Sequence, residues 1–224
     1  MKSLSRSGGI LLHPSSLPGP HGIGDLGPQA YRFVDWLVST GSKLWQVLPL
    51  GPTGYGDSPY QCFSAFAGNP YLISLHALVQ DGLLTPDDLK EVPTFEASRV
   101  DYGLLIPWKL GLLHQAFSRI SSAPKALREE FEQFRAGNTS WLEDYTLFMA
   151  LKEANGGGAW SDWDQLLRKR DPSAMEQARK ELAESILRYS FYQFLFFCQW
   201  NKLRQYANEK GIKEQQLVCI CVHS

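Results

Sequence analysis

The sequence predicts an α/β protein whose first elements are a strand, a helix and a second strand of one parallel sheet. Two apolar runs bounded by turn residues, 9–13 and 44–48, have the length and composition of strands buried on both faces. Between them, apolar residues recur at helical spacing from Ala30 to Val38. A crossover of this length makes the strands parallel and the connection right-handed, so the loops after both strands share one face of the sheet.

Composition excludes several classes of function. With 224 residues, 44% of them hydrophobic, the chain can bury a large core. A net charge of −1 gives no electrostatic reason to bind nucleic acid or an anionic membrane. No apolar run reaches the roughly 18 residues of a membrane-spanning helix, and the N-terminus lacks the apolar segment of a secretory signal. We therefore expect a cytosolic-type soluble protein.

The cysteines fit the same expectation. Cys62, Cys198, Cys219 and Cys221 match no spacing of a zinc site. Disulfides are rare in reducing compartments, so we expect these residues to be free thiols.

The first helix and the loop that follows the second strand have clear sequence signals. Pro28 suits the first position of a helix, and Gly41 can end it in the left-handed conformation. Glycine and proline then punctuate residues 49–70, so no regular element persists there. This loop follows the carboxyl end of a buried strand, where α/β proteins place binding sites. An ordinary long surface loop is the alternative.

Beyond this loop the pattern is helical up to about residue 180, and we interpret the stretch as an insertion into the α/β body. Thr85 is expected to cap a helix start, and Ser140 with Glu143 has the spacing of a capping box. Helices are predicted over 101–121, 127–135, 140–152 and 173–211, the last one apolar nearly all round its middle and therefore buried against more than one layer. Residues 217–222 have the composition of a third strand.

Chemistry-bearing motifs are scarce. The sequence contains no phosphate-binding glycine loop, no nucleophile elbow and no recognisable carboxylate pair. Tyr55 and Tyr60 stand on either side of Asp57 and Ser58 in the glycine-rich loop. A sugar ring offers C–H groups to an aromatic face and hydroxyls to carboxylates, so such a loop suits carbohydrate. The same residue types also make packed loops, and both interpretations stay open at this point.

Four segments resemble the N-terminal part of the 4-alpha-glucanotransferases, also called the amylomaltase or disproportionating-enzyme family. The similarity extends from about Ser7 to Ile212 and is carried by GGILLHPSSLPGPHGIGDLGPQAYRFVDWL, LWQVLPLGPTGYGDSPYQCFSAFAGNPYLISL, VDYGLL and WLEDYTLFMALKEANGG.

The resemblance implies the N-terminal part of a (β/α)8 TIM barrel with a largely helical insertion, the barrel being incomplete in this chain. Residues 1–52 would form the first βαβ unit, and 53–180 a loop and a mostly helical subdomain. Residues 181–212 would be a long barrel helix, and 213–224 a divergent tail in place of the next barrel strand.

The implied activity is the transfer of α-1,4-glucan segments between maltooligosaccharides by a retaining double displacement. A cytoplasmic location is implied rather than a plastid one. The expected partners are maltooligosaccharides or other α-1,4-glucans from starch, glycogen or maltodextrin metabolism. No metal or organic cofactor, no nucleic acid and no membrane is expected.

The resemblance also assigns roles to residues of this sequence that match the family's motifs. Tyr60 corresponds to the tyrosine that stacks on the sugar next to the scissile bond, and Asp57 and Ser58 correspond to its polar neighbours. Tyr55 and Tyr102 correspond to a tyrosine pair that forms a secondary glucan site away from the catalytic cleft.

The catalytic carboxylates have no counterpart in this sequence. In the family they lie in segments of the kind RIDHFRG, EDLG and HDN, and none of these strings occurs here. After Ile212 the sequence reads KEQQLVCICVHS instead of the expected third strand. We therefore expect a truncated product without catalytic residues, inactive alone. The alternatives are a non-catalytic α-glucan-binding fragment and a non-functional product that does not fold stably.

Overall fold

The computed structural model describes residues 6–216, except that the side chains of Tyr55 and of residues 214–216 lie outside the description. The chain divides into two compact units, residues 1–123 with 195–224, and residues 124–194. The boundary falls inside the last helix. The division of the barrel and its insertion given above remains a prediction.

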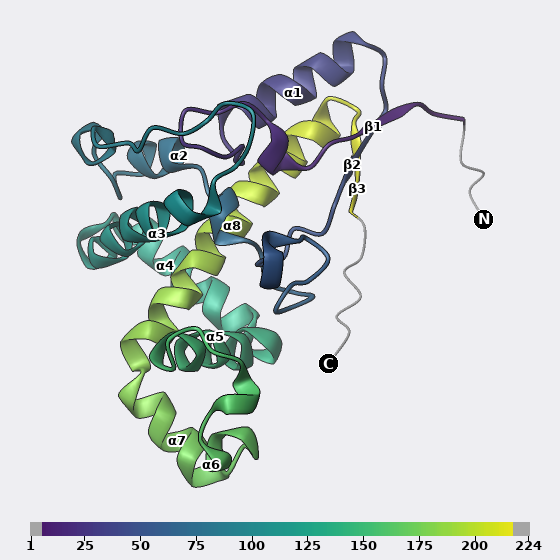
Figure 1. Cartoon of the computed structure of the whole chain (residues 1–224). Coiled ribbons are helices and arrows are strands. Elements are labelled where there is room, and N and C mark those ends of the chain that lie inside the picture. Colours follow the sequence, from purple (N-terminus) through teal and green to yellow (C-terminus); the bar gives the residue numbers. More distant parts are fainter. Residues whose placement is uncertain (1–5, 217–224) are drawn as a thin grey trace. The chain divides into compact units, whose positions relative to one another are not determined.

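The first unit contains a parallel sheet of three strands in the order β1-β2-β3, namely β1 (Gly9–Leu11), β2 (Leu44–Val47) and β3 (Lys213–Gln216) (Figure 1). Trp45 lies opposite Ile10 on one side and opposite Glu214 on the other. The predicted parallel arrangement of the first two strands is therefore confirmed. The strand predicted at 217–222 lies outside the described residues.

Burial differs between the strands. Trp45 and Val47 of β2 are completely buried, because β2 has a neighbour on each side. In β1, Ile10 is 36% and Leu11 54% exposed. The expectation that the first strand is buried is therefore wrong, because its apolar side chains stay accessible. Within the described residues β1 is also an edge strand, which pairs only with β2.

Helix α1 (Pro28–Ser39) begins and ends where its sequence signals place it. Pro28 takes the first helical position, and Gly41 has a φ of 73° just beyond the end. Ala30, Val34 and Leu37 of its apolar stripe are buried, whereas Val38 is exposed. The ring of Phe33 packs edge-on against the ring of Trp45 in β2 with centroids 5.1 Å apart. The helix thus covers the sheet as a βαβ crossover requires.

The rest of the first unit before residue 124 is made of short turns and two helices. Thr85 forms the predicted cap as part of a capping box with Asp88, on a short 3-10 turn. Asp101 caps α3 by accepting a hydrogen bond from the backbone N–H of Leu104. The elements are η1 (Pro14–Ser16), η2 (Tyr55–Asp57), η3 (Pro70–Leu72), α2 (Leu75–Gln80), η4 (Pro86–Leu89), α3 (Tyr102–Ser118) and η5 (Ile120–Ser122).

The second unit is helical and has its own core. Leu147, Leu151, Trp163, Met175 and Ala178 form one buried cluster. Its elements are α4 (Lys125–Gly137), α5 (Thr139–Ala154), η6 (Trp160–Asp162), α6 (Gln165–Arg168), α7 (Pro172–Glu181) and the first part of α8 (Ala183–Glu209).

Two local predictions in this region are wrong. The capping box of Ser140 and Glu143 does not form, because α5 begins at Thr139 and Ser140 lies inside its first turn. The helix predicted over 173–211 is two helices, because Leu182 has a ψ of 18° and ends α7. Apolar periodicity continues through such a break and cannot reveal it.

The second half of α8 belongs to the first unit and fixes the elements around the β2 loop. The side-chain amide of Gln199 accepts a hydrogen bond from Ser74 N (2.7 Å) and donates one to Ser74 O (3.2 Å). The hydroxyl of Tyr206 donates to Asp35 of α1 at 2.7 Å. The predicted burial of this helix on most sides is confirmed, with Phe191, Tyr192, Phe194, Leu195 and Phe196 at most 2% exposed.

Cys198 forms no disulfide, as predicted, whereas Cys62 is disulfide-bonded, so the expectation is wrong there. Cys219 and Cys221 lie outside the described residues. Over the described part of the chain, every helix is too short or too polar to cross a membrane.

Candidate functional site

Residues 49–70, between β2 and η3, fold back on themselves as a narrow loop. Thr53 and Cys62 form an antiparallel bridge, and the N–H of Gly54 donates to the carbonyl of Gln61 at 2.7 Å. At the base, the N–H of Asn69 donates to the carbonyl of Leu50 at 2.7 Å. These bonds place the predicted site residues 57, 58 and 60 together in the turn that closes the loop.

The turn has an unusual backbone. Gly56 and Asp57 both have positive φ angles, 67° and 54°. Glycine adopts this left-handed region freely, and aspartate is among the few other residues that tolerate it. For Asp57 the conformation costs roughly 1 kcal/mol, and such residues gather at functional sites. The tight turn therefore holds a carboxylate at a position that the surrounding hydrogen bonds enforce.

Tyr60 is an accessible aromatic residue of this turn. Its side chain is 54% exposed, so a ligand can reach the ring. Ser58 supports it from inside the turn: its hydroxyl accepts from the N–H of Tyr60 at 3.3 Å, and its carbonyl accepts from the N–H of Gln61 at 3.1 Å. Ser58 therefore shapes the turn, and Tyr60 offers a surface.

Two further tyrosines, Tyr71 and Tyr102, lie close to each other in the same unit. The rings of Tyr71 in η3 and Tyr102 at the start of α3 have centroids 6.5 Å apart and planes at 60°. Burial raises the pKa of Tyr71 to about 12, and the charges of Asp57 and Tyr102 add to the effect. Burial also raises the pKa of Tyr102, again with a contribution from Asp57. Both phenols are therefore protonated at neutral pH and able to donate hydrogen bonds.

The secondary pair of Tyr55 and Tyr102 stays a prediction. Tyr102 is half-buried at the N-terminus of α3. The side chain of Tyr55 lies outside the described part of the structure, so its pairing with Tyr102 stays a prediction. Tyr71 was missed by the sequence analysis, because it begins an apolar run in which a tyrosine looks like a core residue.

The backbone of Tyr71 is held from two sides. Its N–H donates to the side-chain oxygen of Asn69 at 2.9 Å, and its carbonyl accepts from Nζ of Lys109 at 2.7 Å. The side chain of Lys109 is completely buried, and burial lowers the pKa of its amine to about 8, while the carboxylate of Asp25 opposes the shift. These contacts fix η3 against α3 and so fix the two tyrosine rings.

An apolar cavity of about 210 Å³ lies beside the base of the same loop. The loop residues Leu50 and Phe66 line it together with Phe196 and Trp200 of α8. Phe66 is 66% exposed. The described residues around this cavity include no carboxylate and no histidine, so the cavity can bind apolar surface but offers no group for acid–base chemistry.

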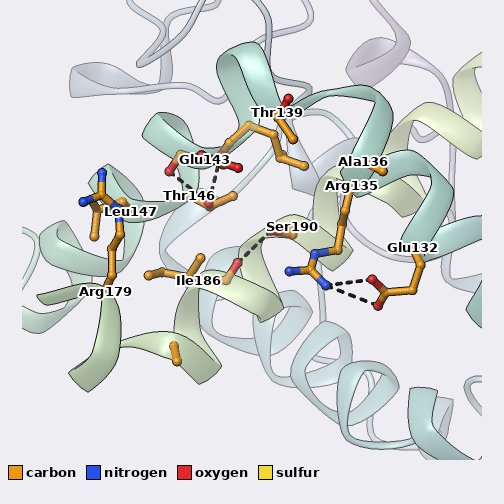
Figure 2. A pocket seen from close by; sticks show the side chains of 12 residues that line it. Glu132, Arg135, Ala136, Thr139, Glu143, Thr146, Leu147, Arg179, Ile186 and Ser190 are labelled. Carbon is orange, nitrogen blue, oxygen red and sulfur yellow. Dashed lines mark hydrogen bonds and ion pairs between the residues drawn. The ribbon is translucent and has the colours of Figure 1, made fainter. Parts of the chain in front are cut away.

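A second cavity, of about 580 Å³, lies within the helical unit (Figure 2). Arg135 on its wall forms an ion pair with Glu132 at 2.9 Å. The hydroxyls of Thr146 and Ser190 donate to carbonyls one turn earlier on their own helices, at 2.8 and 2.9 Å. These three lining side chains therefore already have partners within the helical unit. Within residues 6–216, moreover, no group of three His, Cys, Asp or Glu side chains could hold a metal ion.

Comparison with known sequences gives a consistent family. Residues 12–224 match the family model described as 4-alpha-glucanotransferase. This match includes the segment after Ile212, where the resemblance predicts a departure from the family. The 4-alpha-glucanotransferase of Thermus thermophilus is 51% identical over 211 residues, which are 94% of this chain and 41% of that protein. The chloroplastic/amyloplastic 4-alpha-glucanotransferase of Solanum tuberosum is 44% identical over 92% of this chain and 37% of its own length.

Solved structures agree. An amylomaltase from Streptococcus agalactiae in complex with acarbose superposes with a TM-score of 0.90 and 38% identity, covering 95% of this chain and 43% of the other. An amylomaltase from Corynebacterium glutamicum has the same fold in this region, with a TM-score of 0.71 at 16% identity. The chain spans about 41% of the length of the first curated relatives that it matches.

Proposed function

The chain belongs to the 4-alpha-glucanotransferase family, and on that premise we propose that it is the part of such an enzyme that holds α-1,4-glucan chains during transfer between maltooligosaccharides. The observation that carries the proposal is the turn at residues 57–60, where an accessible tyrosine stands on a rigid, hydrogen-bonded loop at the carboxyl end of β2. In parallel α/β folds this end of the strands carries the ligand site.

In the proposed mechanism the residues of this chain bind and orient the substrate. The ring of Tyr60 stacks on the sugar beside the scissile bond, while Ser58 keeps the turn in shape. The reaction is a retaining double displacement: a carboxylate nucleophile forms a glycosyl-enzyme, and the 4-hydroxyl of an acceptor sugar replaces it. The family segments that carry those carboxylates do not occur in this sequence.

We propose further that this chain by itself is inactive and retains glucan without cleaving it. The support is chemical: the cavity beside the loop is apolar, and the turn offers one carboxylate where the reaction needs two. A non-catalytic α-glucan-binding fragment is the runner-up function, and the exposed ring of Tyr60 supports it equally. A non-functional product that does not fold is the remaining alternative.

Two measurements on the purified chain test these proposals. Incubation with maltotriose should give neither glucose nor longer oligomers, because the nucleophile and the acid are missing. Native electrophoresis through amylose should retard the chain, and Tyr60→Ala should reduce the retardation several-fold. Trp160→Ala removes an aromatic ring that is 52% exposed in the other unit and serves as the matched control.

The outcomes separate the alternatives. Disproportionation of maltotriose would contradict the inactivity of the chain. Lack of retardation by a chain that melts cooperatively would contradict glucan binding. Lack of a cooperative melt would favour the non-folding alternative.

Family membership also leads to expectations about cellular location, cofactors and partners. We propose a cytoplasmic protein that needs no metal or organic cofactor and binds neither nucleic acid nor membrane. Its glucans would come from starch, glycogen or maltodextrin. Fractionation of the source cells, with the chain detected by antibody, checks the location.

A further inference from the structure

We propose that the cavity of about 580 Å³ within the helical unit is a docking site for α-1,4-glucan, made entirely from residues of that unit. The inference rests on the proposed glucan binding and adds a site that none of the motif residues belongs to. A cavity of this size falls in the range of small-molecule sites, about 300–1,000 Å³.

The walls of the cavity come from four helices. Arg135 lies on α4, Glu143 and Thr146 on α5, Arg179 on α7, and Ser190 on α8. Arg135 and Arg179 approach the cavity from opposite sides (Figure 2). Side chains carried by helices are held more precisely than side chains carried by loops, so the arrangement of these groups is set before a ligand arrives.

The inner wall of the cavity is apolar. Leu142 and Leu147 are 3% and 2% exposed, and Ile186 is half-buried. The small side chains of Ala136 and Ala183 also line the cavity and leave space beside this wall. A glucose ring carries apolar C–H groups on its faces, and these gain free energy when they leave water against such a wall.

The charged side chains of the lining balance one another. Two guanidiniums, those of Arg135 and Arg179, accompany two carboxylates, those of Glu132 and Glu143. The cavity therefore carries no formal net charge and has no electrostatic preference for a phosphate, a carboxylate or a cation. An uncharged ligand suits it best.

These charged groups also have unused hydrogen-bonding capacity. Arg135 reaches Glu132 through Nη1 only, at 3.2 and 2.9 Å. Within residues 6–216, the side chains of Arg179 and Glu143 make no ion pair and no hydrogen bond. A guanidinium only donates and a carboxylate only accepts, whereas a sugar hydroxyl does both. A polyhydroxylated ligand can therefore engage both kinds of group at once.

Two buried hydroxyls add acceptors deeper in the cavity. Thr146 is 1% and Ser190 4% exposed. Each donates its proton to a carbonyl of its own helix, Leu142 O at 2.8 Å and Ile186 O at 2.9 Å. Their oxygen lone pairs remain able to accept, so the hydroxyls of a sugar that lies on the apolar wall can donate to them.

Arginine modification by phenylglyoxal, read by mass spectrometry of peptides from the full chain, tests this site by itself. Saturating maltoheptaose should slow the modification of Arg179 several-fold, because bound glucan covers its guanidinium. Arg128 is the matched control, since it is exposed on α4 and does not line the cavity. Its modification should not change.

Three variants define which groups act. Glu143→Gln should raise the maltoheptaose concentration for half-protection about tenfold, the loss of one charge-assisted hydrogen bond, whereas Glu130→Gln, at an exposed acid of α4 outside the lining, should leave it unchanged. Ala183→Trp fills the cavity and should abolish the protection. Tyr60→Ala should preserve the protection, because Tyr60 belongs to the other unit.

The outcomes separate this inference from the proposed function. Equal modification of Arg179 with and without maltoheptaose, in a chain that amylose still retards through Tyr60, would overturn the inference and leave the proposed function intact. Protection by citrate but not by maltoheptaose would assign the cavity to anions and overturn it as well. Protection that disappears in Tyr60→Ala would contradict an independent site. Absence of both protection and retardation in a folded chain would contradict both proposals.

Discussion

The side chain of Lys109 is completely buried, which is rare for an amine because its charged form is costly to remove from water. It donates a hydrogen bond to the carbonyl of Tyr71, and the charge of Asp25 lies nearby. Burial lowers the pKa of His21; the charge of Asp25 opposes this shift, and the charges of Lys109 and His76 add to it. The buried lysine therefore holds the backbone of Tyr71 in place, and removing its amine from water costs free energy.

This cost gives a pH dependence. The pKa of Lys109 falls from 10.5 to about 8 on folding, so between these values the unfolded chain binds a proton that the folded chain does not. Stability from this group is therefore lowest below pH 8 and rises with pH, by about 2 kcal/mol between pH 7 and pH 10. Urea unfolding of the chain and of Lys109→Met across this range should show the rise in the former only.

Other titrating groups also change the stability of the chain with pH, and the pH range and the control variant are chosen to separate them from Lys109. Tyr71 acts in the opposite direction, because the unfolded phenol loses its proton near pH 10 while the folded one keeps it to about 12, so the comparison ends at pH 10. Lys125→Met, at a side chain 81% exposed, is the control and should leave the pH profile unchanged. Parallel profiles for the chain and Lys109→Met would contradict the assignment.

At the scale of elements, the loop over 49–70 approaches helix α8 so closely that only glycine fits. A Cβ on Gly68 would overlap the ring of Phe196, which is 2% exposed. Gly111 in the middle of α3 is the opposite case, with nothing within 4 Å of such a Cβ.

The two positions predict opposite effects of the same substitution. Gly68→Ala should lower the free energy of unfolding by roughly 1–3 kcal/mol, because it forces the loop away from α8. Gly111→Ala should raise it by up to about 1 kcal/mol, because alanine favours the helix. Chemical denaturation of the two variants beside the unmodified chain measures both. A neutral Gly68→Ala would show that the loop does not rest on α8.

At the scale of the whole molecule, the sheet has an open side. Within the described residues β1 pairs only with β2, and its Leu11 is 54% exposed. An unpaired apolar strand edge recruits other strands. We expect the chain to self-associate as its concentration rises, with Leu11→Lys reducing the association.

Sedimentation velocity over a concentration series measures this. Leu104→Lys adds the same charge at a leucine 48% exposed on α3, away from the strand edge, and should leave the association unchanged. A chain that stays monomeric at every concentration, or equal effects of the two lysines, would contradict a role for the β1 edge.

The sequence by itself determined the local elements and the family. The parallel pair of strands and the bounds of α1 follow from apolar period, Pro28 and Gly41, which act over a few residues. The predicted cap at Thr85 is also confirmed, because a helix cap depends only on residues close in sequence. Motifs over nearly the whole length indicated the 4-alpha-glucanotransferase family, which the family match confirms, while the role of Tyr60 stays a prediction.

Only the tertiary structure decided which of these residues act together. Asp57 stands directly before Ser58 and three residues before Tyr60 in the turn, and sequence proximity grouped them. The fold also brings together the rings of Tyr71 and Tyr102, with centroids 6.5 Å apart, and the buried Lys109 donates a hydrogen bond to the carbonyl of Tyr71. The break at Leu182 and the open face of β1 likewise depend on packing between distant segments. Local propensity carries no information on such contacts, because their free energy comes from partners that the chain meets only after it folds.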